Sequence, residues 1–273
     1  MSRTNDNIRF WRSAALPWLE ARLTRDGRHI AYGLHSHDAF SLGAILGGRS
    51  VYRYHDSGGE QVLPLTAGAV VAMNPGEVHA CNPVDDLPWS YGMLYIDADY
   101  LAGLQPDGGP LRPVGVRASR DAALYGALAT LFDDLFDTAT RVAPERVDAL
   151  LRLALATLEA DSEENRLESA ALAGVATLIR ERCTETLTLE GIASQAGMSV
   201  AHLVRAFRRH YGITPHAFVI DCRLRYGQQR LRQGASIAEA ALASRFADQA
   251  HFQRVFKRLT AATPGRYRHA ISE

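Results

Sequence analysis

The sequence predicts an α+β fold of two domains, an antiparallel β-barrel with following helices and then an all-α domain. Its 273 residues are enough to form two compact cores. Between residues 30 and 97, short apolar runs alternate with turn residues, whereas beyond residue 121 apolar residues recur at helical spacing. The third observation is an internal repeat within residues 187–267.

Short strands are predicted in the first domain, which we place at residues 1–118. Gly, Asn, Asp and Pro separate its apolar runs, which is typical of an antiparallel sandwich or barrel. The runs are AYGLHSH, FSLGAILGG, SVYRYHDSGGEQVLPL, TAGAVVAMNPGEVH and PWSYGMLYID.

Two amphipathic helices are predicted next, over 121–137 and 144–160, within a helical region at 119–160. We expect this region to pack on the barrel or to join two copies of the chain in a homodimer. Residues 161–168 are acidic and poor in apolar side chains, which predicts a linker. The helical domain is then expected at 169–273.

The formal net charge of zero hides an asymmetry between the two halves. Residues 1–169 hold 15 Arg against 23 Asp and Glu, a net charge of about −8, and residues 170–273 hold 15 Arg and Lys against 7 Asp and Glu, about +8. A basic half joined to an acidic half favours a nucleic-acid binder with a separate control domain. A solvated basic surface is the alternative explanation.

Several classes of protein are not favoured. The chain has no run of about 18 apolar residues and no apolar stretch typical of a signal peptide, so we expect a cytoplasmic protein. Cys81, Cys183 and Cys222 lack the spacing of a zinc or redox motif. Because no P-loop, dinucleotide fingerprint or nucleophile–base motif is present, we expect neither catalysis nor a cofactor.

Residues 187–218 and 236–267 are two copies of one unit, with a one-residue insertion in the turn of the second copy. Each copy predicts a short helix, a tight turn and a second helix that begins after an N-cap, Ser199 or Asp248. This is the layout of a helix-turn-helix. The matched residues include Ala193 with Ala241, Arg205 with Arg254, Phe207 with Phe256, and the Thr-Pro pairs at 214–215 and 263–264.

One face of each second helix is predicted to read DNA. The other face carries Leu203 and Phe207, or Phe252 and Phe256, which should pack inward. In the major groove Arg can make two hydrogen bonds to guanine and Gln two to adenine, and small residues let the helix approach the bases. For each residue a solvated surface side chain is the alternative. The candidate contacts are Ala201, His202, Val204, Arg205, Arg208, Gln249, Ala250, His251, Gln253 and Arg254.

A linking helix is predicted between the two units, over residues 215–234, and it carries Arg223, Arg225, Arg230 and Arg232. If it holds the two second helices roughly 34 Å apart, which is one turn of DNA, one chain can enter two successive major grooves.

The first unit reads GIASQAGMSVAHLVRAFRRHYGITP and the second reads FADQAHFQRVFKRLTAATPGRYR. With these motifs residues 169–270 resemble the DNA-binding domain of the AraC/XylS family of transcription regulators. The resemblance implies seven helices and base contacts from the two second helices. The second unit departs from the family pattern, because Arg245 and Ala261 stand where members usually have Gly. If either position needs a positive φ, a residue other than Gly costs about 1 kcal/mol there. Alternatively, the Arg245 side chain adds a contact to a DNA phosphate.

HSH at 35–37 and GAVVAMNPGEVH at 68–79 resemble the two motifs of the small cupin-like barrel that precedes this DNA-binding domain in many AraC-type proteins. His35, His37 and His79 are therefore weak candidates for a divalent metal site. Enzymatic cupins usually have a carboxylate four residues after the second His, where this chain has Ser41. Sensor members of the family generally work without metal, so we expect no bound metal here.

The mouth of the predicted barrel is the candidate effector site. Its expected lining residues are His35, His37, His79, Trp89 and Tyr91, because an apolar wall with a few polar groups suits a small polar ligand. Trp89 and Tyr91 share the inward face of one strand, which is equally consistent with ordinary core residues.

The sequence thus predicts a sequence-specific transcription regulator, expected to be an activator, in which a small-molecule effector bound by the cupin-like domain controls DNA binding or dimer arrangement. The expected partners are double-stranded promoter DNA, the effector, a second copy of the chain and, for an activator, RNA polymerase. Two alternatives stay open. One is a metal-dependent cupin enzyme with a DNA-binding appendage, and the other is a regulator whose barrel only dimerises.

Overall fold

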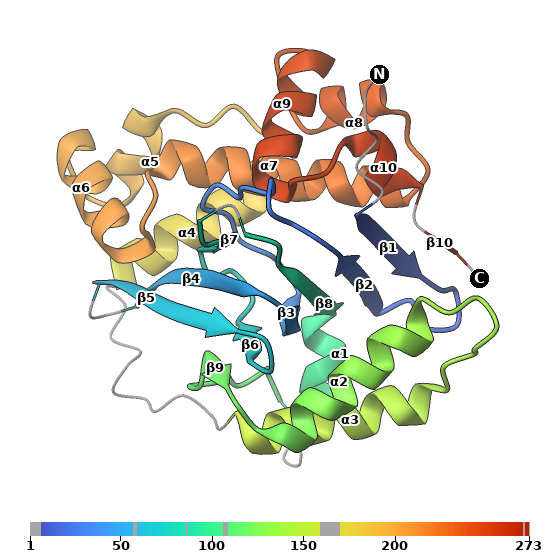
Figure 1. The fold of residues 1–273 in the computed structure, drawn as a ribbon. Coiled ribbons are helices and arrows are strands. Elements are labelled where there is room, and N and C mark those ends of the chain that lie inside the picture. Colours follow the sequence, from blue (N-terminus) through green and yellow to red (C-terminus); the bar gives the residue numbers. More distant parts are fainter. Residues whose placement is uncertain are drawn as a thin grey trace.

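The computed structural model describes residues 7–56, 59–85, 87–105, 109–158, 170–269 and 271–272. Two β-sheets lie between two groups of helices, one formed by residues 98–157 and the other by residues 170–268 (Figure 1). The predicted class, an antiparallel sheet domain followed by a helical domain, is confirmed.

The larger sheet has the strand order β10-β1-β2-β8-β3-β6-β9, and the smaller sheet has the order β5-β4-β7. All described strand pairs are antiparallel except that of β1 with β10. The strands are β1 (Ile8–Arg12), β2 (Leu19–Thr24), β3 (Phe40–Gly47), β4 (Arg49–Asp56), β5 (Gly59–Thr66), β6 (Val70–Met73), β7 (His79–Pro83), β8 (Ser90–Ile96), β9 (Ala118–Ser119) and β10 (Ile271–Ser272).

The prediction that the sheets close into a barrel was wrong, since no described strand of one sheet pairs with a strand of the other. The run 31–37, predicted as a strand, forms only the single bridge between His35 and His79. Two of its backbone donors are used by the helical domain instead. The Gly33 N–H donates to the Arg258 carbonyl at 3.1 Å, and the Ser36 N–H donates to the Asp221 carboxylate at 3.2 Å. The sequence also missed β1 and β2, which precede the predicted strand region.

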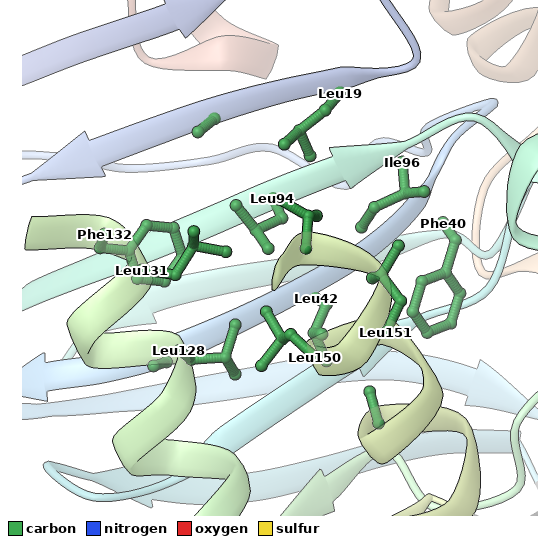
Figure 2. Close-up of a cluster of buried hydrophobic side chains, with 14 of the residues drawn as sticks. Leu19, Phe40, Leu42, Leu94, Ile96, Leu128, Leu131, Phe132, Leu150 and Leu151 are labelled. Atoms are coloured by element: carbon green, nitrogen blue, oxygen red, sulfur yellow. The ribbon is translucent and has the colours of Figure 1, made fainter. Parts of the chain in front are cut away.

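The outer face of the larger sheet is covered by α1 (Ala98–Gly103), α2 (Ala122–Leu135) and α3 (Pro144–Thr157). Leu128, Leu131 and Phe132 of α2 pack on Leu42 and Leu94 of the sheet (Figure 2). The apolar faces of the two predicted helices are therefore largely used by the sheet. The predicted linker at 161–168 lies outside the described residues.

The second helical group has the seven helices that the family resemblance implies, counted over residues 170–269. The two second helices of the repeat, α6 and α9, begin after the predicted N-caps, since Ser199 Oγ accepts from the His202 N–H and Asp248 Oδ1 from the His251 N–H. No helix in the described part of the chain is long and apolar enough to cross a membrane. The seven are α4 (Ala170–Arg182), α5 (Leu189–Gln195), α6 (Val200–Tyr211), α7 (Pro215–Arg232), α8 (Ile237–Ala243), α9 (Gln249–Thr260) and α10 (Pro264–Arg268).

Both halves of the helical group share hydrophobic cores with the sheet domain. Ile8 and Phe10 of β1 belong to one buried cluster with Phe252 and Phe256 of α9. Val78, from the loop before β7, belongs to a second cluster with residues of α4, α5, α6 and α7. In this structure, therefore, the helical domain does not bury its apolar surface by itself.

Arg245 and Ala261, which stand where family members usually have Gly, adopt the left-handed backbone conformation that glycine favours. Arg245 has φ of 61° and Ala261 has φ of 54°, and the matching Gly197 and Gly212 have φ of 64° and 74°. The repeat therefore imposes the same left-handed turns on residues that carry a Cβ, at an energetic cost.

Replacing Ala261 with Gly should stabilise the chain by up to about 1 kcal/mol. The left-handed backbone strain of a residue with Cβ is removed, and the greater freedom of Gly in the unfolded chain offsets part of that gain. Urea denaturation of the full chain measures the change. Ala262→Gly is the matched control, because Ala262 is not among the positive-φ residues and should lose stability. An Ala261→Gly variant less stable than the parent would contradict the prediction.

Candidate functional site

The two candidate reading helices present one buried and one exposed face each. Leu203 and Phe207 of α6, and Phe252 and Phe256 of α9, are fully buried, as the spacing predicted. In Figure 1 α6 lies beyond one end of α7 and α9 lies over the middle of α7, which joins the two units. The geometry thus offers two separate polar helix faces held on one connecting helix.

Most of the predicted base contacts lie on these exposed faces. Val204 and His251 are half-buried, and the His251 ring packs edge-on against Phe246 at 5.2 Å between centroids. The other eight are exposed, namely Ala201, His202, Arg205, Arg208, Gln249, Ala250, Gln253 and Arg254.

The arginines of α7 bind neighbouring parts of the protein. Arg223 donates to the carbonyl of Cys183 at 2.8 Å, and Arg232 donates to the Tyr267 hydroxyl at 3.0 Å. Arg230 donates to Gln233 at 3.1 Å. Arg225, only 7% exposed, pairs with Asp221 and with Asp38 of the sheet domain. These side chains fix α7 within the molecule.

The five predicted effector residues come together between the two sheets. His35, His37, His79, Trp89 and Tyr91 all line one small cavity of about 30 Å³ with mostly apolar walls. Trp89 also has a structural role, since its indole N–H donates to the Gly27 carbonyl at 2.8 Å and its ring stacks on Tyr91 at 4.4 Å. The cavity is therefore lined both by candidate effector residues and by side chains that belong to the hydrophobic core between the sheets.

The three histidines are held as neutral imidazoles at neutral pH. Burial lowers the pKa of His35 to about 4 and that of His79 to about 3. Burial, followed by the neighbouring His35 and His79, holds the pKa of His37 well below its usual range. Ring centroids of the three lie 4.7 to 5.0 Å apart.

A larger cavity, of about 110 Å³, lies between the sheet domain and the helical domain. His35 and His37 line both cavities, so the two adjoin. The sheet domain contributes Arg22, Tyr32 and Tyr95, among others, to the larger cavity. The helical domain contributes Asp221, Leu224, Arg225, Gln228, Arg232, Leu259, Thr260 and Tyr267.

Arg22 lines this cavity, is only 2% exposed and forms no ion pair with a carboxylate among the described residues. Its Nη1 donates to the Thr260 carbonyl at 2.6 Å and its Nε to Thr24 at 3.3 Å. The Nη2 atom is buried and has no hydrogen-bond partner among the described residues. The guanidinium carbon lies 5.4 Å from the ring centroid of Phe10 and 5.3 Å from that of Tyr32.

The other two arginines of the cavity, the buried Arg225 and the exposed Arg232, lie near carboxylates. Arg225 pairs with Asp221 and Asp38, and Arg232 lies 3.7 Å from Glu20. A buried charge is expensive without a partner, and no carboxylate among the described residues forms an ion pair with Arg22, so an anion bound beside it would supply that partner. Arg22 was not among the predicted site residues, and its signal was an arginine between the apolar Ala21 and Leu23 of β2.

Two family models match the chain. The model described as "AraC-like ligand binding domain" matches residues 18–173, which is more than half of the chain, and the one described as "Helix-turn-helix domain" matches residues 192–270. The sheet domain and the repeat therefore fall in two recognised domains of known regulators.

Similar proteins extend over most of the chain. The "Uncharacterized HTH-type transcriptional regulator YbfI" of Bacillus subtilis is 24% identical over 225 residues, 80% of this chain and 80% of that protein. The "HTH-type transcriptional activator RhaS" of Pectobacterium atrosepticum is 25% identical over 256 residues, 88% of each. The crystal structure of unsaturated fatty acid bound ToxT from Vibrio cholerae shares the fold, with a TM-score of 0.57 at 14% identity over 100% of both chains. This chain belongs to the AraC family of transcriptional regulators, with an N-terminal ligand-binding domain and a C-terminal helix-turn-helix domain.

Proposed function

We propose that this regulator reads two boxes of promoter DNA with α6 and α9, under the control of an anionic effector bound between its domains. The observation that carries the DNA part is the pair of exposed faces around Arg205 and Arg254, each on a capped helix backed by buried phenylalanines. Arg205 and Arg254 occupy the same position in the two copies, so each is suited to one base step in its own major groove.

Arg205→Ala should weaken binding at one box by roughly 5- to 150-fold, and Arg254→Ala should do the same at the other box, since a bidentate base contact contributes about 1–3 kcal/mol. The measurement is fluorescence anisotropy of the full chain on duplexes selected from a random library, with one box altered at a time. Arg49→Ala, which removes an exposed charge from β4 of the sheet domain, is the control. Equal loss at both boxes from either substitution would contradict base reading and indicate phosphate contacts.

The effector that best fits the interdomain cavity is a small carboxylic acid. Arg22 supplies a buried cation with an unused donor, and Phe10 and Tyr32 supply apolar surface beside it. The ToxT structure with bound unsaturated fatty acid shares this fold, which supports an acid as the ligand class. Because both domains line the cavity and Arg22 donates to Thr260 of α9, a ligand at Arg22 would lie between the two domains.

Small carboxylic acids should raise the melting temperature of the full chain, whereas their primary amides should not. A charge-assisted hydrogen bond contributes about 1.5–3 kcal/mol, so Arg22→Met should weaken binding of the acid by roughly 10- to 150-fold. Calorimetric titration of both proteins with each acid and amide measures this. Equal stabilisation by acid and amide would show that the cavity does not select a negative charge.

We further propose a homodimeric, cytoplasmic activator that contacts RNA polymerase. The name of RhaS, an activator, supports the sign of regulation. The outer groove between α2 and α3, of about 400 Å³ and lined by Gly126, Ala127, Thr130 and Leu153, is our candidate for the dimer contact. We assign residues 1–118 to the effector domain, 119–160 to the dimerisation region and 169–273 to the DNA-binding domain.

We propose that the chain has no catalytic activity of its own, because the relatives that extend over most of its length are named as regulators. The same observation disfavours the metal-dependent enzyme considered from the sequence. A regulator whose sheet domain only dimerises is disfavoured by the cavity that both domains line around the buried Arg22, which dimerisation through α2 and α3 leaves unexplained.

A further inference from the structure

The three histidines between the sheets have the arrangement of a ligand set. One ring nitrogen of each lies within 4.8 Å of one ring nitrogen of the other two. A tetrahedral ion with metal–nitrogen distances of about 2.0–2.1 Å would bring the nitrogens to about 3.4 Å from one another. Rotation of the imidazoles about their side-chain bonds can provide a closure of this size.

Two of the imidazoles are already oriented for ligation by their second nitrogen. His35 Nδ1 lies 2.8 Å from the Gly33 carbonyl, and His79 Nδ1 lies 2.9 Å from the Glu77 carbonyl. A carbonyl only accepts, so each Nδ1 carries the proton and each Nε2 keeps a free lone pair. A backbone carbonyl that fixes the tautomer in this way is the usual partner of a metal-binding histidine.

The strand next to Tyr95 carries a further buried hydroxyl. Ser41 is fully buried in β3, and its hydroxyl has no hydrogen-bond partner within the described part of the chain. Strand alternation places Ser41 on the face opposite Phe40 and Leu42, toward the space between the sheets. Its neighbour across the strand pair is Tyr95, whose ring lies 4.9 Å from that of His37. Ser41 is therefore a buried hydroxyl one strand away from the contact between Tyr95 and His37.

The same short segment ties the sheet domain to the linking helix. His35 and His37 face the cluster, whereas the intervening Ser36 donates from its Oγ to Asp221 of α7 at 2.6 Å. Asp38, the next residue, pairs with Arg225 of α7. Any movement that draws His35 and His37 together therefore acts on two polar contacts to the helix that joins the two reading units.

We propose that His35, His37 and His79 bind one divalent transition-metal ion, and that its binding is transmitted through Ser36 and Asp38 to α7 and hence to DNA reading. Imidazole nitrogens favour Zn²⁺, Cu²⁺, Ni²⁺ and Fe²⁺ over the oxygen-seeking Mg²⁺ and Ca²⁺. Sequence analysis predicted a site without metal because Ser41 replaces a carboxylate, but three imidazoles with open positions form a known set for such ions.

The first test is direct metal binding to the chelator-treated full chain. Titration with Co²⁺ should give visible ligand-field bands that saturate at one ion per chain, and Zn²⁺ should remove them by competition. His37→Gln and His79→Gln should each lose the bands, whereas His29→Gln, which changes an exposed histidine, should keep them. No bands in the parent protein, or unchanged bands in both cluster variants, would overturn the proposal.

A second measurement does not depend on whether the variants fold. X-ray absorption of the Zn²⁺-loaded parent chain should show imidazole nitrogens at about 2.0–2.1 Å. A shell of sulfur ligands at about 2.3 Å without imidazole nitrogen would place the ion away from the three histidines and overturn the assignment.

A third experiment, which rests on the proposed DNA binding, tests whether metal binding is transmitted to the DNA-reading helices. Zn²⁺ should change the affinity of the full chain for its selected duplex by at least about fivefold, within the usual range of allosteric coupling. Ser36→Ala should still bind Co²⁺ and should lose most of this change, whereas Ser90→Ala should retain it. If the parent chain binds Co²⁺ in the first test but its affinity for DNA does not change when Zn²⁺ is added, the proposed transmission is overturned.

Discussion

Phe10→Ala in the first strand should destabilise the whole chain by about 3–5 kcal/mol, the usual range for removing a buried phenylalanine ring. Phe10 is buried in one cluster with Phe252 and Phe256, and its ring meets Tyr267 edge-on at 5.2 Å. Because these partners belong to the DNA-reading domain, loss of a side chain from the sheet domain should loosen that domain as well. Urea denaturation followed by circular dichroism measures the loss.

Val62→Ala is the control for this prediction, since Val62 is 51% exposed and should change stability little. A loss below about 1 kcal/mol would contradict the shared core. Two separate unfolding transitions, of which Phe10→Ala shifts only that of the sheet domain, would also contradict the shared core. The result also decides how DNA binding is best measured, because a fragment that begins near residue 169 lacks Ile8, Phe10 and Ile30.

Asp221→Ala should cost about 3–5 kcal/mol, because it leaves the buried Arg225 without its buried partner. It also removes the acceptor of the Ser36 N–H and hydroxyl. Asp38, which pairs with Arg225 from the sheet domain, has a side chain that is 72% exposed, so solvent screens its contribution.

The matched control for Asp221→Ala is Glu190→Ala, which removes an exposed carboxylate from the same domain. Thermal unfolding of the two variants and the parent gives the comparison. If Asp221→Ala unfolds at the temperature of the control, the contact between Ser36 and α7 contributes nothing to holding the domains together.

The sequence was most informative where local rules decide the structure. The two N-caps, the buried phenylalanines of α6 and α9 and the left-handed turns at Arg245 and Ala261 all follow from spacing within one helical unit. The helices predicted over 121–137 and 144–160 correspond to α2 and α3 within a few residues. Each of these features depends on residues close together in the chain.

The candidate site was less predictable because it depends on contacts between distant segments. Arg22 meets Thr260 across 238 positions, and Ser36 meets Asp221 across 185 positions. No pattern within residues 31–37 shows that their donors are used by the helical domain, and this is why a strand was predicted there. The histidine motif was visible, but the carbonyls that orient His35 and His79 follow only from the fold.

The proposed control of DNA reading depends on an acid held at Arg22 between the domains. Its most direct test is the dissociation constant of the full chain for its selected two-box duplex, with and without a saturating acid found by thermal shift. We expect a change of about 5- to 150-fold in the parent chain, the usual range of allosteric coupling, and no change in Arg22→Met. An acid that binds the parent through Arg22 and leaves its affinity for DNA unchanged would contradict the claim.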